Sequence, residues 1–171
     1  MRSWPAPAKP PYLTCDPRWP QHFERLRARV DAALDGVPHE TIHVGSTAVP
    51  GLAARPIIDL DAVVPAGQVT AAVAALAAAG WQPEGDLGIA GREAFRPLPG
   101  EPYHHLYVVT VDSQPYRDHV DLRDYLRSHP AAAARYAAVK YQLAPLLTTD
   151  PTAYVTGKAG LIAELLASAR K

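Results

Sequence analysis

The sequence has little of several features that mark specialised classes of protein. It contains one cysteine, Cys15, in 171 residues, so no intramolecular disulfide can form and a reducing compartment suits the chain. Its 17 basic and 17 acidic side chains cancel. The chain therefore lacks the net positive field that would favour nucleic acid or an acidic membrane surface.

Long apolar runs are also missing. The longest, over residues 69–79, is too short and too rich in alanine to cross a bilayer. The first residues carry prolines instead of the apolar segment of a signal peptide. We therefore expect a soluble cytoplasmic protein with no membrane partner.

What the chain does have is the composition of one globular unit. Hydrophobic residues make up 48% and charged residues 20% of a length that suits a single core. Residues 1–17 hold five prolines and no periodicity, which predicts an irregular N-terminal arm. Residues 18–171 are predicted to form one domain.

The hydrophobic pattern predicts an α/β (α+β) fold. Apolar residues at helical spacing predict helices over residues 19–34, 69–79, 114–128, 131–147 and 152–169. Short β-branched or alternating runs predict strands over residues 39–44, 56–64, 81–83, 93–96 and 104–111. This order favours a mixed sheet with helices packed on one face and a helical C-terminal part.

Two aspartates interrupt the most apolar predicted strand. Asp59 and Asp61 stand two residues apart, so their side chains should leave the strand on the same face. Two carboxylates on one face repel each other unless a cation lies between them, and Mg²⁺ prefers oxygen ligands of this kind. The alternative is that one aspartate ends the strand while the other pairs with an arginine.

A glycine-rich loop precedes this strand. Gly45, Ser46 and Thr47 follow the strand over residues 39–44, and Arg55 lies between the loop and Asp59. Glycine allows the backbone to approach a phosphate closely, and the two hydroxyls and the guanidinium can bind its oxygens. Taken alone, the Gly-Ser pair is more typical of an ordinary turn at the end of a strand.

Together these residues resemble a known family. The run HVGSTAVPGLAARPIIDLDAVV, residues 43–64, is similar to the GrpB-like family of the nucleotidyltransferase superfamily, which is marked by a Gly-Ser turn and an Asp-x-Asp strand. The segments GDLGIAGREAF, HHLYVV and RDYLRSHPAAAARYAAVKYQLA also resemble later parts of that family. The resemblance covers about residues 16–169.

The resemblance implies a nucleotidyltransferase-like fold. It places Gly45 and Ser46 near a triphosphate and Asp59 and Asp61 on a metal ion, for which Mg²⁺ is the expected choice. Family members also occur as a domain attached to dephospho-CoA kinase, where a role in the folding of that enzyme has been suggested.

One feature departs from the superfamily pattern. Active members use a third carboxylate on a later strand, and here the corresponding strand begins His104-His105 with no acid. His105, or His104, takes that place, while Asp112, Asp121 and Asp124 follow further along the chain. A second arrangement would bring His43, His104 and His105 to the two aspartates as a Zn²⁺ or Mn²⁺ site.

Two hypotheses about function follow. In the first, the protein transfers a nucleotide, with Asp59, Asp61 and His105 in the catalytic site and Gly45, Ser46, Thr47 and Arg55 binding the triphosphate. The acceptor would be a small molecule or a protein, since the charge balance disfavours nucleic acid. In the second, the domain binds a nucleotide without turnover, or assists the folding of a partner such as dephospho-CoA kinase.

Overall fold

The computed structural model describes residues 9–171. Residues 9–17 lie along the domain, and Thr14 forms an isolated antiparallel bridge with Ala54 through two hydrogen bonds of 2.9 Å. The first eight residues of the predicted proline-rich arm lie outside the described part of the chain.

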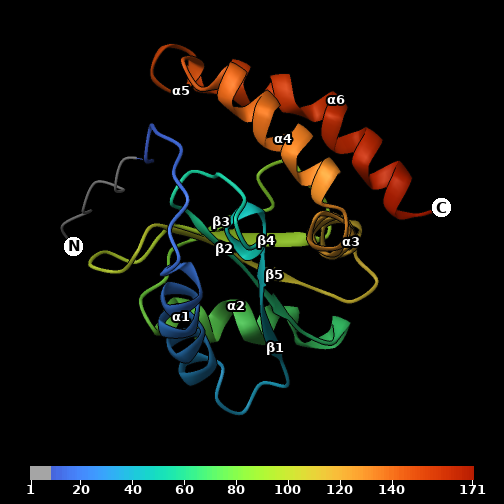
Figure 1. The fold of residues 1–171 in the computed structure, drawn as a ribbon. Coiled ribbons are helices and arrows are strands. Elements are labelled where there is room, and N and C mark those ends of the chain that lie inside the picture. Colours follow the sequence, from blue (N-terminus) through green and yellow to red (C-terminus); the bar gives the residue numbers. More distant parts are fainter. Residues whose placement is uncertain (1–8) are drawn as a thin grey trace.

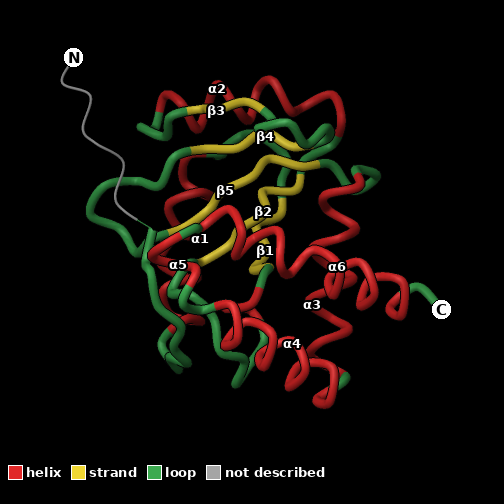
Figure 2. Tube along the Cα trace, turned by 90° about the horizontal axis from the view of Figure 1, so that it is seen from above, coloured by secondary structure: helices red, strands yellow, loops and turns green. Residues whose placement is uncertain are grey.

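A five-stranded mixed sheet forms the centre of the molecule, in the order β1-β2-β5-β4-β3 (Figures 1 and 2). The central β2 and β5 are parallel, and the other three pairs are antiparallel. The strands are β1 Glu40–Val44, β2 Ile58–Val63, β3 Pro83–Gly85, β4 Arg92–Phe95 and β5 His104–Val109.

Helices cover both sides of this sheet. The helices longer than one turn are α1 Trp19–Ala33, α2 Val69–Ala78, α3 Gln114–Ser128, α4 Pro130–Leu143 and α6 Pro151–Ala169. Short helical turns are η1 Ser46–Ala48, η2 Ala66–Gln68 and α5 Leu146–Thr149. In Figure 1, α1 and α2 lie below the sheet, and α4 and α6 lie above it. The α/β fold and its helical C-terminal part are confirmed, but the helices are not confined to one face as the order of elements predicted.

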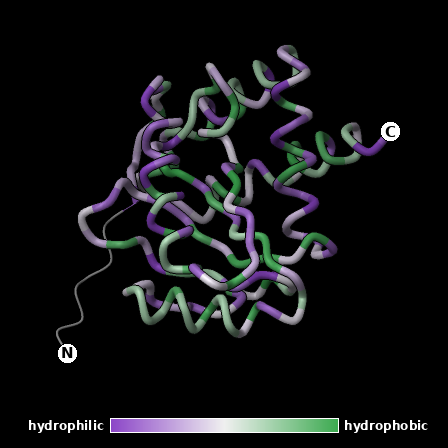
Figure 3. The backbone as a smooth tube through the Cα atoms, turned by 90° about the horizontal axis from the view of Figure 1, so that it is seen from below, coloured by the Kyte–Doolittle hydropathy of each residue, from purple (hydrophilic) through white to green (hydrophobic). Residues whose placement is uncertain are grey.

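Two hydrophobic clusters explain this arrangement. The larger one packs the buried stripe of α1, which includes Phe23 and Leu26, and Leu76 of α2 against Leu60 and Leu106 of the sheet. The smaller one joins the loop after η1 to α3, α4 and α6. In Figure 3 green, hydrophobic stretches lie in the interior of the molecule, and purple stretches are frequent on the helices near the C-terminus. The C-terminal helices therefore have a core of their own and stand over the second face of the sheet.

Element ends follow local chemistry. The helix predicted over 131–147 stops at Leu143, and α5 begins after Pro145, because proline has no N–H to continue the helical hydrogen bonds. Pro130 and Pro151 occupy the first turns of α4 and α6, where the missing N–H costs nothing. The strand predicted over 81–83 lies at Pro83–Gly85 instead, and Trp81 just before it is buried in the larger hydrophobic cluster.

Candidate functional site

The two aspartates of β2 point away from the larger core. Ile58, Leu60 and Ala62 belong to the hydrophobic cluster with α1 and α2, and alternate residues of a strand face opposite sides. Asp59 and Asp61 therefore face the C-terminal helices. The expectation that both carboxylates leave one face of the strand is confirmed.

Each aspartate has a histidine partner. Nδ1 of His105, the neighbour of Asp59 in the parallel pair of β2 and β5, donates to Asp59 Oδ1 at 2.9 Å. Nδ1 of His119 on α3 lies 3.0 and 2.8 Å from the two oxygens of Asp61. An ionised carboxylate only accepts hydrogen bonds, so Nδ1 is the donor in both pairs. The acids are thus partnered by imidazoles from two different elements.

The environments of the two carboxyl groups differ. The side chain of Asp61 is fully buried, whereas that of Asp59 is 27% exposed. Burial raises the pKa of Asp61, against the hydrogen bond and charge of His119. Burial also opposes ionisation of Asp59, but the His105 hydrogen bond and the nearby His119 and His43 hold its pKa below the usual value. Asp59 is therefore the more acidic of the two carboxyl groups and the one that reaches solvent.

Gly45 fits against Asp59 in a way that only glycine permits. Its φ of +73° and ψ of −172° lie in a region that other residues avoid. A Cβ added at Gly45 would overlap Asp59 Oδ2 and lie 2.9 Å from Asp59 Cγ. The turn that carries Ser46 therefore packs directly on the carboxylate.

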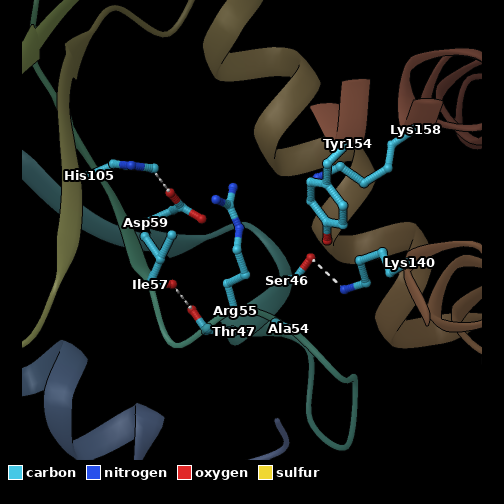
Figure 4. Close-up of a pocket in the computed structure, with 10 residues that line it drawn as sticks. All are labelled: Ser46, Thr47, Ala54, Arg55, Ile57, Asp59, His105, Lys140, Tyr154 and Lys158. Atoms are coloured by element: carbon cyan, nitrogen blue, oxygen red, sulfur yellow. Dashed lines mark hydrogen bonds and ion pairs between the residues drawn. The ribbon is translucent and has the colours of Figure 1, made fainter. Parts of the chain in front are cut away.

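A cleft opens between this turn, β2 and the C-terminal helices (Figure 4). Its volume is about 110 Å³, and it is lined by Ser46, Thr47, Ala54, Arg55, Ile57, Asp59, His105, Lys140, Tyr154 and Lys158. The cleft thus gathers the Gly-Ser turn, one acid and three basic side chains from four separate segments. A second hollow shares Ser46, Asp59 and Lys158 with it and reaches His119 and Tyr136.

The basic side chains dominate this space. Lys140 of α4 is buried, and its Nζ lies 3.1 Å from Ser46 Oγ and 4.6 Å from the ring centre of Tyr136. Lys158 of α6 and Arg55 contact the ring of Tyr154, and Figure 4 shows Arg55 between Asp59 and Tyr154. Asp59 is the one acidic residue that lines the cleft in the described part of the chain.

Burial and nearby positive charges lower the pKa of both lysines. The pKa of Lys140 falls to about 7 because it is desolvated and lies near Lys158 and Arg55. The pKa of Lys158 falls to about 8, through burial and Arg55, with Asp59 opposing the change. With Arg55 and both lysines protonated, the cleft would hold three positive charges against the single charge of Asp59, which favours the binding of an anion.

The other predicted binding residues have distinct places. Ser46 and Arg55 point into the cleft, and Gly45 lies beside it. The Thr47 hydroxyl donates to the Ile57 carbonyl at 3.0 Å and also contacts His43 Nε2 at 2.9 Å. Thr47 thus fixes the loop through bonds within the protein.

The proposed cluster of three histidines is wrong. His43 pairs with Leu60 across the strands and stacks on Phe23, so it lies on the core side of the sheet. His104 is also in the core, where its Nε2 accepts from the Leu98 amide at 3.2 Å. Within residues 9–171, no group of three or more His, Cys, Asp or Glu side chains could hold a metal ion.

No third carboxylate approaches from the later segments considered. Asp121 pairs with Arg170 at 2.8 Å, Asp124 pairs with Arg123 at 2.7 Å, and Asp112 accepts from the Thr110 hydroxyl at 2.6 Å. These aspartates line neither hollow described above. The side chains that contact Asp59 and Asp61 are therefore those of His105 and His119.

The donor set fits Mg²⁺ only in part. Asp59 lines the cleft, and its Oδ1 accepts a hydrogen bond from His105. Asp61 is fully buried, and both of its oxygens accept from His119. The residues therefore suit an ion held by Asp59 together with the oxygens of a bound phosphate and water. They do not suit an ion held between both acids.

Several site residues escaped the sequence reasoning. The sequence patterns predict no role in the site for His119, Lys140, Tyr154 or Lys158. Lys140 and Lys158 are each the one lysine of their helix, but lysine is usually exposed, so the sequence carries no signal that either side chain enters a cleft.

Comparisons with known proteins agree with this architecture. Cid1, solved with the UTP analogue UMPNPP, is similar in fold, with a TM-score of 0.54 and 10% identity over 75% of this chain and 41% of that one. This likeness defines the fold class as a nucleotidyltransferase-like mixed α/β fold. The conserved protein GrpB of Enterococcus faecalis has a TM-score of 0.81 and 30% identity, covering 92% of this chain and 96% of that one.

Sequence comparison identifies the family. The family model described as GrpB protein matches residues 13–168, and the chain belongs to the GrpB family. UPF0157 proteins of Pseudomonas aeruginosa and Deinococcus radiodurans are 40% and 34% identical over 92% and 90% of the chain. The chain spans 66% of the first and 79% of the second, and 41% of the similar protein YqkA of Bacillus subtilis.

No helix within residues 9–171 is long and apolar enough to span a membrane.

Proposed function

We propose that this GrpB-family domain binds a nucleoside triphosphate in the cleft between the Gly45–Ser46 turn and the C-terminal helices. The observation that carries the proposal is the meeting of Arg55, Lys140 and Lys158 around one serine hydroxyl and one acid. A triphosphate carries several negative charges, which these three cations can neutralise. The fold supports the proposal, because the structurally similar Cid1 has been solved with a UTP analogue and with MgGTP.

Each side chain would have a separate task. Arg55 and Lys158, both beside Tyr154, would bind phosphate oxygens at the mouth of the cleft. Ser46 Oγ would donate to a phosphate oxygen, and Lys140, 3.1 Å from it, would add charge at the inner end. An approaching phosphate would raise the pKa of both lysines, because it supplies the negative charge that the empty protein lacks.

Mg²⁺ would accompany the triphosphate, held by Asp59 and by phosphate oxygens. A bound Mg²⁺ supplies charge neutralisation and polarises the α-phosphate for in-line attack by an acceptor. His105 would hold the Asp59 carboxylate in place through its 2.9 Å bond. Asp61, buried against His119, would add negative charge behind Asp59 without contacting the ion.

A second candidate is a domain that binds the nucleotide without transferring it. It is favoured by Asp61, whose two oxygens already accept from His119, and by the histidine found where active members of the superfamily have a third acid. The partner would then be another protein, with dephospho-CoA kinase as one case that the family resemblance suggests. For the transferase, the acceptor would be a small molecule or a protein. In both cases we propose that the protein works in the cytoplasm.

Calorimetric titration with ATP, GTP, CTP and UTP, each with Mg²⁺, tests the binding site. We expect at least one triphosphate to bind the wild type and to bind Asp59→Ala and Lys158→Met at least tenfold more weakly, a loss of about 1.4 kcal/mol each. Lys171→Met, which removes an exposed lysine at the chain end, is the matched control and should bind like the wild type. Equal affinity in all four proteins would remove the cleft from consideration.

Pyrophosphate release separates the two candidates. A transferase releases pyrophosphate when the acceptor is present, and Asp59→Ala should abolish that release. A binding domain shows the same affinities with no release in the presence of candidate small-molecule acceptors or cell extract depleted of nucleotides.

A further inference from the structure

The contact between Ser46 and Lys140 places a buried amine beside a serine hydroxyl, an arrangement that nucleotide binding does not require. Lys140 is 2% exposed, and its Nζ lies 3.1 Å from Ser46 Oγ. A buried ammonium group is costly without a carboxylate beside it. In the described chain Lys140 has the serine hydroxyl and the face of the Tyr136 ring as neighbours instead.

The groups around Lys140 also disfavour a positive charge on its amine. Lys158 on α6 and Arg55 on the loop before β2 are positive, and both oppose a charge on Lys140. The phenols of Tyr136 on α4 and Tyr154 on α6 are kept neutral, since burial raises the pKa of both groups. The negative charge of Asp59, the acid of the cleft, raises the pKa of Lys158. A neutral amine is thus the form that this site accommodates best.

The Ser46 hydroxyl is placed where a molecule bound in the cleft could reach it. Ser46 follows the constrained Gly45 at the end of β1 and lines both hollows on the site face of the sheet. The loop beyond it is fixed by the bond from Thr47 to the Ile57 carbonyl. The hydroxyl therefore points into the cleft from a turn with little freedom to move, and the amine lies within hydrogen-bond distance of it (Figure 4).

We infer that Ser46 and Lys140 form a nucleophile and general-base pair that cleaves a small ester carrying an anionic group. An amine within reach of a serine hydroxyl is one of the arrangements that activate serine. The volume of about 110 Å³ admits a short acyl group, and Arg55 and Lys158 would bind the anionic group. This activity goes beyond the proposed nucleotide site and stands whether or not a nucleotide binds there.

The reaction balances with the groups present. Ser46 Oγ forms a bond to the carbonyl carbon while its proton passes to Lys140 Nζ, and the bond from carbon to the leaving alcohol breaks. Lys140 returns the proton to the departing alkoxide. Water then attacks the acyl serine, Lys140 takes a proton from the water, and the acid leaves as Ser46 regains its hydrogen.

A fluorophosphonate probe tests the pair directly. Ser46 Oγ would bond to phosphorus, fluoride would leave, and Lys140 would take the hydroxyl proton. We expect a mass-spectrometric adduct on Ser46 in the wild type and none in Ser46→Ala. Lys140→Met should slow labelling at least 100-fold, whereas Ser128→Ala, an exposed serine that bonds only to its own helix and His129, should label normally. Hydrolysis of 4-acetoxybenzoate, a small ester that carries a carboxylate, should follow the same order.

The pH dependence of labelling guards against variants that fail to fold. In the wild type, the labelling rate should rise with pH around the pKa of Lys140, about 7, because only the neutral amine takes the proton. An absent adduct on Ser46, or a Lys140→Met rate equal to that of the wild type with circular dichroism unchanged, overturns the inference. Nucleotide affinity measured on the same samples shows separately whether the proposed function holds.

Discussion

Replacing Gly45 by alanine tests whether the turn and Asp59 form a single unit. At Gly45 the φ of +73° and ψ of −172° cost a residue with a side chain about 1–3 kcal/mol. The added Cβ would also overlap Asp59 Oδ2, so the carboxylate must turn away from His105. Losing that charge-assisted hydrogen bond costs a further 1.5–3 kcal/mol or so.

We expect Gly45→Ala to lower the free energy of unfolding by about 2.5–6 kcal/mol. Gly36 provides the matched control, since its φ is +81° and an added Cβ meets nothing within 4 Å. Gly36→Ala should therefore lose only the backbone contribution, about 1–2 kcal/mol. Guanidinium denaturation followed by circular dichroism measures both values on proteins of the same length.

The difference between the two variants isolates the contact with Asp59. Gly45→Ala should also weaken triphosphate binding, because the displaced carboxylate can no longer hold its position in the cleft, while Gly36→Ala should bind like the wild type. Equal losses of stability in the two variants, with unchanged binding in both, would refute the packing of the turn on Asp59.

Two further predictions concern buried charges. His119→Ala should lower the free energy of unfolding by about 3 kcal/mol, because it leaves the buried Asp61 without its partner; Asp61→Asn in the same chain should restore part of that loss, and no restoration would contradict the account. Lys140→Met should remove a pH dependence of the free energy of unfolding. The pKa of Lys140 is about 7 in the folded protein and 10.5 in the unfolded chain. Between these two pH values the unfolded wild type therefore binds one proton more than the folded wild type. The stability of the wild type relative to Lys140→Met should therefore rise by several kcal/mol from pH 7 to pH 10, and denaturation curves that keep a constant separation over this range would contradict it.

Most of the fold could be predicted from local patterns. The apolar spacing of Phe23, Leu26 and Val30 identified α1, and the run over 114–128 matched α3 at both ends. These signals depend on periodicity and capping within the element itself. The side of the sheet on which the C-terminal helices lie depends on the loop after η1 and on a second core, which no single segment specifies.

The site divides in the same way. Asp59, Asp61 and Ser46 could be predicted because the alternation of a strand and a short loop fix their direction within a few residues. Lys140 and Lys158 could not, because they reach the cleft from helices about 80 to 100 residues further along the chain. The placement of His105 beside Asp59 follows from the register of two parallel strands, and that register is set by the packing of the whole sheet.

The central claim is that a triphosphate lies in the cleft with its phosphates among the three basic side chains. A crystal structure of the chain with a non-hydrolysable nucleoside triphosphate and Mg²⁺ tests it most directly. The account predicts phosphate oxygens in hydrogen-bond contact with Ser46 and Lys158, and the metal ion on Asp59. A nucleotide bound at another surface, or a cleft that stays empty at saturating nucleotide, would contradict it.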